Sequence, residues 1–98
     1  MIRDTVIATL RAHEADLRSK GVTRAALFGS SARGEAMPGS DLDIMVEIDP
    51  AAHVDLYRYV GITQFIAGLF AGPVDVVERA AMIPSVRKTA DQDAVYAF

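Results

Sequence analysis

The feature that most restricts the fold of this sequence is the alternation of side chains over residues 41–48. Every second side chain is apolar, and these residues are Leu42, Ile44, Val46 and Ile48. Between them stand Asp41, Asp43, Met45 and Glu47. Side chains two residues apart in a β-strand point to the same face of the sheet, so the pattern predicts a strand with one face in a hydrophobic core. Two aspartates must then lie on its other face.

The other elements follow from hydrophobic periodicity and from the glycines and prolines that interrupt it. In chain order they are a helix over 2–20, a strand over 22–28, a loop over 29–40, the strand over 41–48, a helix over 55–70, a strand over 74–77 and a helix over 84–97. Helical spacing supports the helices, and short apolar runs bounded by turn residues support the strands. This order predicts an α/β fold in which helices cover a small sheet.

Apolar stripes assign an inward face to two of these helices. In the helix over 55–70 the stripe comprises Leu56, Tyr59, Val60, Thr63, Ala67 and Phe70. In the final helix it comprises Val86, Ala90 and Ala94. A further apolar group is too large for one stripe, and it comprises Phe65, Ile66, Leu69 and Phe70. We expect part of this group to form a protein interface, with Tyr57, Phe65 or Phe98 contributing.

Length and composition limit the functions that this chain can have. Its 98 residues predict a single domain over 1–98, and the 51% of hydrophobic residues is typical of a folded globular protein. The absence of cysteine excludes disulfides and thiolate chemistry. Neither a signal peptide nor an apolar run long enough to cross a bilayer is evident. We therefore expect a cytoplasmic protein that does not bind membranes.

Charge is distributed unevenly along the sequence. The net charge of −3 argues against direct binding of nucleic acid, because sequence-independent binding relies on a surplus of lysine and arginine. Residues 1–40 hold six Lys and Arg against four Asp and Glu, whereas residues 41–98 hold four against nine. The acidic second part indicates a need for cations, supplied by metal ions or by a partner.

The paired aspartates of the alternating strand predict a metal site. Asp41 and Asp43 project from one face with α-carbons roughly 6.6 Å apart, where two ionised carboxylates repel unless a cation lies between them. Asp75 is flanked by valines in the last predicted strand, so it also points away from the core. If the two strands are neighbours, the three carboxylates converge. Three hard oxygen ligands are typical of Mg²⁺ or Mn²⁺ sites in phosphoryl and nucleotidyl transfer.

The Gly29-Ser30 turn predicts a phosphate contact for the same site. Glycine lets backbone N–H groups approach an anion, the serine hydroxyl adds a donor, and Arg33 can add a bidentate contact. It is not a Walker loop, because Gly34 is followed by Glu35 and Ala36 rather than by Lys and Ser or Thr. Taken singly, each residue also has a structural explanation, such as a strand end, a turn or a solvated surface. Their combination favours the functional one.

The segment LFGSSARGEAMPGSDLDIMVE, residues 27–47, together with Asp75, resembles the nucleotidyltransferase superfamily related to the DNA polymerase beta palm. More narrowly, it is similar to the minimal nucleotidyltransferases, the MNT-type antitoxins that accompany HEPN-domain toxins. The resemblance implies a palm-like nucleotidyltransferase fold with a small mixed sheet covered by helices. It extends over nearly the whole chain, but its specific part is the quoted segment and Asp75.

The resemblance also implies roles for individual residues. Asp41 and Asp43 would bind two Mg²⁺ ions, and Asp75 would ligate the catalytic ion and help to deprotonate the acceptor hydroxyl. The Gly29-Ser30 pair would hold the β- and γ-phosphates of ATP, and Arg33 matches the arginine of the family's G-S-x-A-R-G pattern. The implied reaction transfers AMP from ATP to a hydroxyl and releases pyrophosphate. In the HEPN systems that hydroxyl belongs to a tyrosine of the toxin.

Three functions are compatible with these residues. The first is a Mg²⁺-dependent adenylyltransferase that modifies a HEPN-type toxin within a hetero-oligomer and so acts as its antitoxin. The second is a non-catalytic antitoxin that masks the toxin's active site by binding, with its acidic part against a basic RNA-cleaving surface. The third is modification of a small molecule such as an aminoglycoside, for which the chain lacks an enclosing domain. The complete aspartate set with Gly29-Ser30 favours the first.

Overall fold

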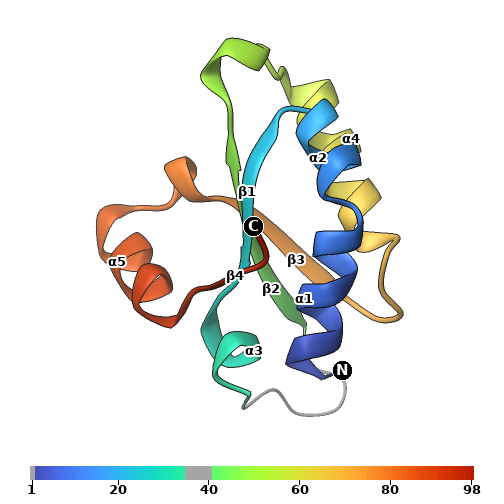
Figure 1. Ribbon diagram of the computed structural model, residues 1–98. Coiled ribbons are helices and arrows are strands. Elements are labelled where there is room, and N and C mark those ends of the chain that lie inside the picture. The colour runs from blue at the N-terminus through green and yellow to red at the C-terminus, as the bar shows by residue number, and fades with distance from the viewer. Residues whose placement is uncertain (1, 35–40) are drawn as a thin grey trace.

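The computed structural model describes residues 2–34 and 41–98 and contains a central sheet with helices packed on both of its faces (Figure 1). The strands are β1 (Val22–Leu27), β2 (Leu42–Ile48), β3 (Val74–Glu78) and β4 (Val95–Tyr96). The helices are α1 (Arg3–Ala12), α2 (Glu14–Ser19), α3 (Gly29–Arg33), α4 (Leu56–Ala67) and α5 (Pro84–Asp93), with short 3-10 turns η1 (Pro50–Ala52) and η2 (Arg79–Ala81). This architecture confirms the predicted α/β class.

The four strands form one mixed sheet in the order β3-β2-β1-β4. β1 runs antiparallel to both β2 and β4, whereas β2 and β3 are parallel. A parallel pair needs a long crossover connection, and α4 lies within the connection between these two strands. The register of this pair sets Asp43 opposite Asp75. The condition on which the predicted carboxylate site depends, that their strands be neighbours, is therefore met.

The main hydrophobic core lies between the sheet and the helices α1, α2 and α4. Three apolar residues of the alternating segment, Leu42, Ile44 and Val46, are buried in it, as predicted. The helices contribute mainly Val6, Leu10, Leu17, Ile62 and Ile66. A second, smaller cluster lies on the opposite face beneath α5 and comprises Ala26, Met45, Met82 and Ala90. The aspartate-bearing face is thus covered in part and open in part.

Two of the predicted segments are divided differently in the structure. The helix expected over 2–20 is interrupted at His13, whose backbone (φ −108°, ψ 16°) leaves the helical region without a glycine or proline to signal it. The loop expected over 29–40 begins with the helix α3. Glycines with positive φ lie at both ends of this short helix, Gly29 at its start and Gly34 at its end. Gly34 is at the C-terminal position where a left-handed glycine commonly ends a helix. Residues 35–40 of the expected loop lie outside the described residues.

The final helix is shorter than predicted. α5 ends at Asp93, and the next residues form β4, which pairs with β1 through Ala26–Tyr96 and Leu27–Val95. The pairing continues as the Ala97 N–H donates to the Ala25 carbonyl at 2.8 Å. Hydrogen bonds between segments so distant in the sequence leave no local periodicity, and here they outweigh a helical pattern.

The inward faces of α4 and α5 differ in part from the prediction. In α4 the buried side chains are Ile62 and Ile66, whereas Leu56 is 78% exposed. Because α4 carries apolar residues around most of its surface, spacing alone does not identify the face that meets the sheet. In α5, Ala90 is buried as expected, but Val86 is 47% exposed.

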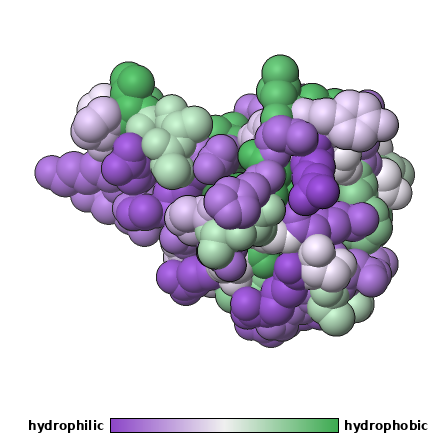
Figure 2. Space-filling view, turned by 90° about the horizontal axis from the view of Figure 1, so that it is seen from above, coloured by the Kyte–Doolittle hydropathy of each residue, from purple (hydrophilic) through white to green (hydrophobic). Residues whose placement is uncertain are grey.

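Apolar side chains on the surface bear on the expected interface. Phe65 and Phe70 pack against the main core, whereas Tyr57 is 88% exposed. On the face seen in Figure 2, hydrophobic residues appear as separate spots among hydrophilic ones. The expected interface stays a prediction. Among the described residues, no helix has both the length and the apolar character needed to span a membrane.

Candidate active site

Asp43 and Asp75 form the centre of the candidate site. They are directly opposite each other in the parallel β2–β3 pair, and strand neighbours in register point to the same face of a sheet. Asp43 is half-buried and Asp75 exposed, while Asp41 is exposed one residue before β2. The alternation that buries Leu42 and Ile44 in the main core thus directs Asp43 to the opposite face.

The Asp43 carboxyl lies in a region with an excess of negative charge. Burial raises the pKa of its carboxyl above the ordinary value, and the carboxylates of Asp75 and Asp41 raise it further. Carboxylates that disfavour each other's ionisation are stabilised by a bound cation, so this donor set fits Mg²⁺ chemically. As the side chains stand, no three or more His, Cys, Asp or Glu residues within 2–34 and 41–98 are grouped to hold a metal ion. Joint ligation by the three aspartates stays a prediction.

Gly29 lies directly against the Asp43 carboxylate. Its φ of 64° lies in the left-handed region, and a Cβ added to it would lie 3.0 Å from Asp43 Oδ2. The preceding residue is tied to the same strand, because the Phe28 N–H donates to the Asp43 carbonyl at 3.0 Å. The structure thus brings the predicted Gly29-Ser30 turn beside the predicted metal ligands, and at this position only glycine avoids both strain and crowding.

Ser31 is a part of the site that the sequence reasoning missed. Its side chain is buried, its Oγ donates to the Asp41 carbonyl at 3.3 Å, and the same Oγ accepts from the Asp43 N–H at 3.3 Å. Ser31 therefore couples α3 to the backbone on both sides of Leu42. The only available signal was a second serine after Gly29-Ser30, which by itself does not distinguish a buried hydroxyl from an exposed one.

Arg33 has a structural partner in addition to any role toward a nucleotide. Its guanidinium forms an ion pair with the carboxylate of Asp93 in the last turn of α5. This contact joins α3 to α5. The predicted phosphate contact of Arg33 is not tested by this arrangement, and it stays a prediction.

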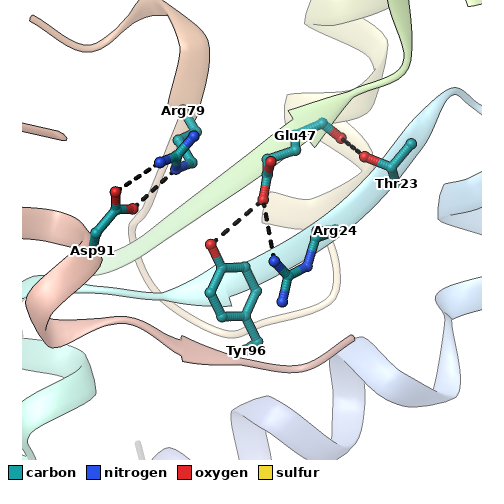
Figure 3. Close-up of polar contacts among 6 residues, drawn as sticks. All are labelled: Thr23, Arg24, Glu47, Arg79, Asp91 and Tyr96. Carbon is teal, nitrogen blue, oxygen red and sulfur yellow. Dashed lines mark hydrogen bonds and ion pairs between the residues drawn. The ribbon is translucent and has the colours of Figure 1, made fainter. Parts of the chain in front are cut away.

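Polar contacts link β4 to β1 and β2, and α5 to η2 (Figure 3). The Arg24 guanidinium lies 3.7 Å from the centre of the Tyr96 ring, and the Tyr96 hydroxyl donates to Glu47 Oε2 at 3.4 Å. Arg79 of η2 binds both carboxylate oxygens of Asp91 in α5, at 2.9 and 2.7 Å. These hydrogen bonds lower the pKa of the Asp91 carboxyl. The position of α5 relative to β3 is thereby restrained.

A mixed sheet with a glycine turn against paired aspartates is the arrangement expected from the resemblance of residues 27–47 and Asp75. Residues 10–97 match the family described as the nucleotidyltransferase domain. The match spans most of the chain, and the chain therefore belongs to the nucleotidyltransferase family.

Two relatives make this family membership more specific. One is a protein of Methanocaldococcus jannaschii, provisionally named a protein adenylyltransferase, which is 35% identical over 89% of this chain and 89% of its own length. The other is the protein adenylyltransferase MntA of Thermococcus cleftensis, which is 30% identical over 95% of this chain and 93% of its own length. The similarity thus extends along almost the whole of each relative.

Solved structures share the fold. A chain provisionally described as a minimal nucleotidyltransferase has a TM-score of 0.81 and 29% identity, over 97% of this chain and 95% of its own. A toxin–antitoxin structure with AMP-PNP has a TM-score of 0.69 and 20% identity, over 100% and 73%. A chain from the structure of the tri-AMPylated HEPN toxin of Shewanella oneidensis in complex with MNT antitoxin has a TM-score of 0.63 and 18% identity, over 94% of this chain and 71% of its own. The last two similarities concern the fold alone. The predicted palm-like nucleotidyltransferase fold is confirmed.

Proposed function

We propose that this protein is a Mg²⁺-dependent protein adenylyltransferase that transfers AMP from ATP to a tyrosine hydroxyl of a HEPN-type toxin and so acts as its antitoxin. The observation that carries the proposal is the register that pairs Asp43 with Asp75, with Gly29 against the Asp43 carboxylate. The two adenylyltransferase relatives support the reaction type. The toxin–antitoxin structures with this fold support the choice of partner and nucleotide.

The proposed chemistry assigns each residue a task. Asp41, Asp43 and Asp75 would hold two Mg²⁺ ions, which supply the positive charge that a triphosphate requires. The acceptor oxygen attacks the α-phosphorus, the bond from phosphorus to the β-phosphate oxygen breaks, and pyrophosphate leaves with that electron pair. Asp75 accepts the proton of the acceptor hydroxyl. Gly29-Ser30 and Arg33 bind the leaving phosphates.

The partner completes the proposed system. The described part of the chain is a sheet with its covering helices, and we infer that the docked toxin selects the acceptor hydroxyl. We expect the two proteins to form a hetero-oligomer in the cytoplasm, where ATP is available, without contact to nucleic acid or membrane by this chain.

The decisive test is the intact mass of a candidate HEPN-type toxin after incubation with this chain, ATP and Mg²⁺. We expect a gain of one or more AMP units, and no gain with the double variant Asp41→Ala/Asp43→Ala. Omission of Mg²⁺ should give the same loss as the double variant. An unchanged mass with the wild-type chain would overturn the proposal.

A second candidate, the non-catalytic antitoxin, is favoured by the acidic composition of residues 41–98, which suits a basic partner. The same double variant separates the two functions. If it still inhibits the toxin in a stable complex, binding alone is sufficient. If inhibition is lost together with the mass gain while the complex persists, the transfer reaction is the antitoxin activity.

A further inference from the structure

Ser31 is the only residue with a polar side chain that is buried among the described residues, with 5% of its surface exposed. It lies in α3, directly after the Gly29-Ser30 pair, and α3 packs beside the start of β2 (Figure 1). Burial of a hydroxyl is unfavourable unless its hydrogen bonds are satisfied. The Ser31 Oγ satisfies them with two backbone groups of the segment that carries Asp41 and Asp43.

The first of these bonds takes the place of a hydrogen bond of the sheet. Opposite residues in an antiparallel pair exchange two backbone hydrogen bonds at every second position. The Phe28 N–H makes one such bond, to the Asp43 carbonyl at 3.0 Å. The Asp43 N–H donates instead to Ser31 Oγ at 3.3 Å, because the chain turns out of the strand direction at Gly29, whose φ is 64°. A side chain of α3 thus continues the β1–β2 pairing.

The second bond holds the residue before β2. Ser31 Oγ donates to the Asp41 carbonyl at 3.3 Å, and a hydroxyl has one donor and two acceptor sites, so both bonds can form together. The peptide between Asp41 and Leu42 is held from its other side by the Leu42 N–H, which donates to the Pro73 carbonyl at 3.1 Å. Ser31 therefore fixes the backbone of Asp41 relative to that of Asp43.

The placement of this backbone bears on whether the carboxylates can act together. As the side chains stand, the aspartates within residues 2–34 and 41–98 are not grouped to hold an ion. Binding of an ion must therefore rotate their side chains about a backbone that stays in place. Groups that hold metal ligands from behind change metal affinity or activity by about 10- to 100-fold when they are removed.

We propose that Ser31 is a positioning residue for the candidate metal site. Its hydroxyl holds the backbone of Asp41 and Asp43 in an arrangement from which both carboxylates reach a shared divalent cation. Because Ser31 belongs to α3, it also ties these ligands to the Gly29-Ser30 turn. The inference rests on the proposed function, to which it adds a residue that acts through the metal ligands.

The test compares two hydroxyls that bind the backbone of the same strand. Ser31→Ala removes both hydrogen bonds at the aspartate end of β2. The matched control is Thr23→Val, which removes the 3.1 Å hydrogen bond to the Glu47 carbonyl near the other end (Figure 3). Urea denaturation measures stability, and the intact mass of the candidate toxin measures transfer. Electron paramagnetic resonance measures the binding of Mn²⁺, which prefers the same oxygen ligands as Mg²⁺.

We expect both variants to unfold at a lower urea concentration than wild type. Only Ser31→Ala is expected to bind Mn²⁺ about 10-fold or more weakly and to lose transfer by a similar factor. Thr23→Val should match wild type in both measurements. If Ser31→Ala does not fold, by circular dichroism, Ser31→Cys keeps the shape with only a weak hydrogen-bonding group and is judged by the same measurements.

The outcomes distinguish this inference from the proposed function. Unchanged Mn²⁺ affinity or unchanged transfer in Ser31→Ala would overturn the inference alone. Equal losses in Ser31→Ala and Thr23→Val would also overturn it, because they would indicate a general loss of stability. A wild-type chain that binds Mn²⁺ but transfers no AMP would overturn the proposed function, and one that binds no Mn²⁺ would overturn both.

Discussion

The two faces of the sheet are built for different purposes. The face under α1, α2 and α4 is closed by a continuous apolar core, in which Leu10, Leu17 and Ile44 are fully buried. The opposite face has a small apolar cluster under α5, and beside it Asp43 and Asp75 project together. One strand, β2, supplies both faces by alternation. We therefore expect the stability of the fold and the proposed chemistry to depend on different residues of the same strand.

The largest effect on this comparison should come from the closed face. Ile44→Ala removes a fully buried side chain from the centre of β2, and we expect the free energy of unfolding to fall by about 2–5 kcal/mol. Urea denaturation measures this change. The control is Ile83→Ala at a position that is 63% exposed, where we expect a change within about 0.5 kcal/mol. Similar losses for the two variants would contradict the separation of the faces.

An intermediate effect on stability is expected at Gly29, which lies against the Asp43 carboxylate. Gly29→Ala forces alanine into a left-handed backbone conformation, at a cost of about 1–2 kcal/mol, and also crowds the Asp43 carboxylate. Gly34→Ala is the matched control, because its φ of 73° is similar but an added Cβ would meet nothing within 4 Å. In urea denaturation we expect both variants to have a lower free energy of unfolding than wild type. Only Gly29→Ala is expected to lose adenylyl transfer. Equal activities would show that the Gly29–Asp43 contact is unimportant.

The smallest effect on stability should come from the open face. Because burial and neighbouring carboxylates raise the pKa of Asp43 in the folded state, the folded protein binds its proton more tightly than the unfolded chain does. This residue therefore destabilises the protein progressively as the pH rises through its ordinary pKa toward the raised one. We expect Asp43→Asn to be slightly more stable than wild type at pH 7, with the difference vanishing at low pH.

Mg²⁺ should reverse that order at neutral pH. An ion that binds only the folded state stabilises it by mass action, so we expect Mg²⁺ to raise the melting temperature of the wild-type chain and not that of Asp43→Asn. Thermal unfolding with and without the ion, at pH 7 and at low pH, measures both effects. If Mg²⁺ leaves the melting temperature of the wild-type chain unchanged, this result would argue against the carboxylate site.

Local patterns were sufficient for the parts of the molecule that depend on a single strand. The alternation over 41–48 predicts both the burial of Ile44 and the direction of Asp43, and the structure has both. Patterns were insufficient wherever distant segments meet. The β1–β4 pairing, the buried Ser31 hydroxyl and the Arg33–Asp93 ion pair each join residues that are 10 to 70 positions apart. Such contacts depend on tertiary packing, which periodicity does not encode.

The pairing of β1 with β4 also has a consequence for how the protein is made. Contacts that span almost the whole chain form late, because a long loop must close before they contribute any stability. The core of β1, β2 and the first two helices uses residues that leave the ribosome early, whereas the β1–β4 pairing requires Val95 and Tyr96. We therefore expect a nascent chain to acquire the scaffold of β1, β2, α1 and α2 before β4 completes the sheet.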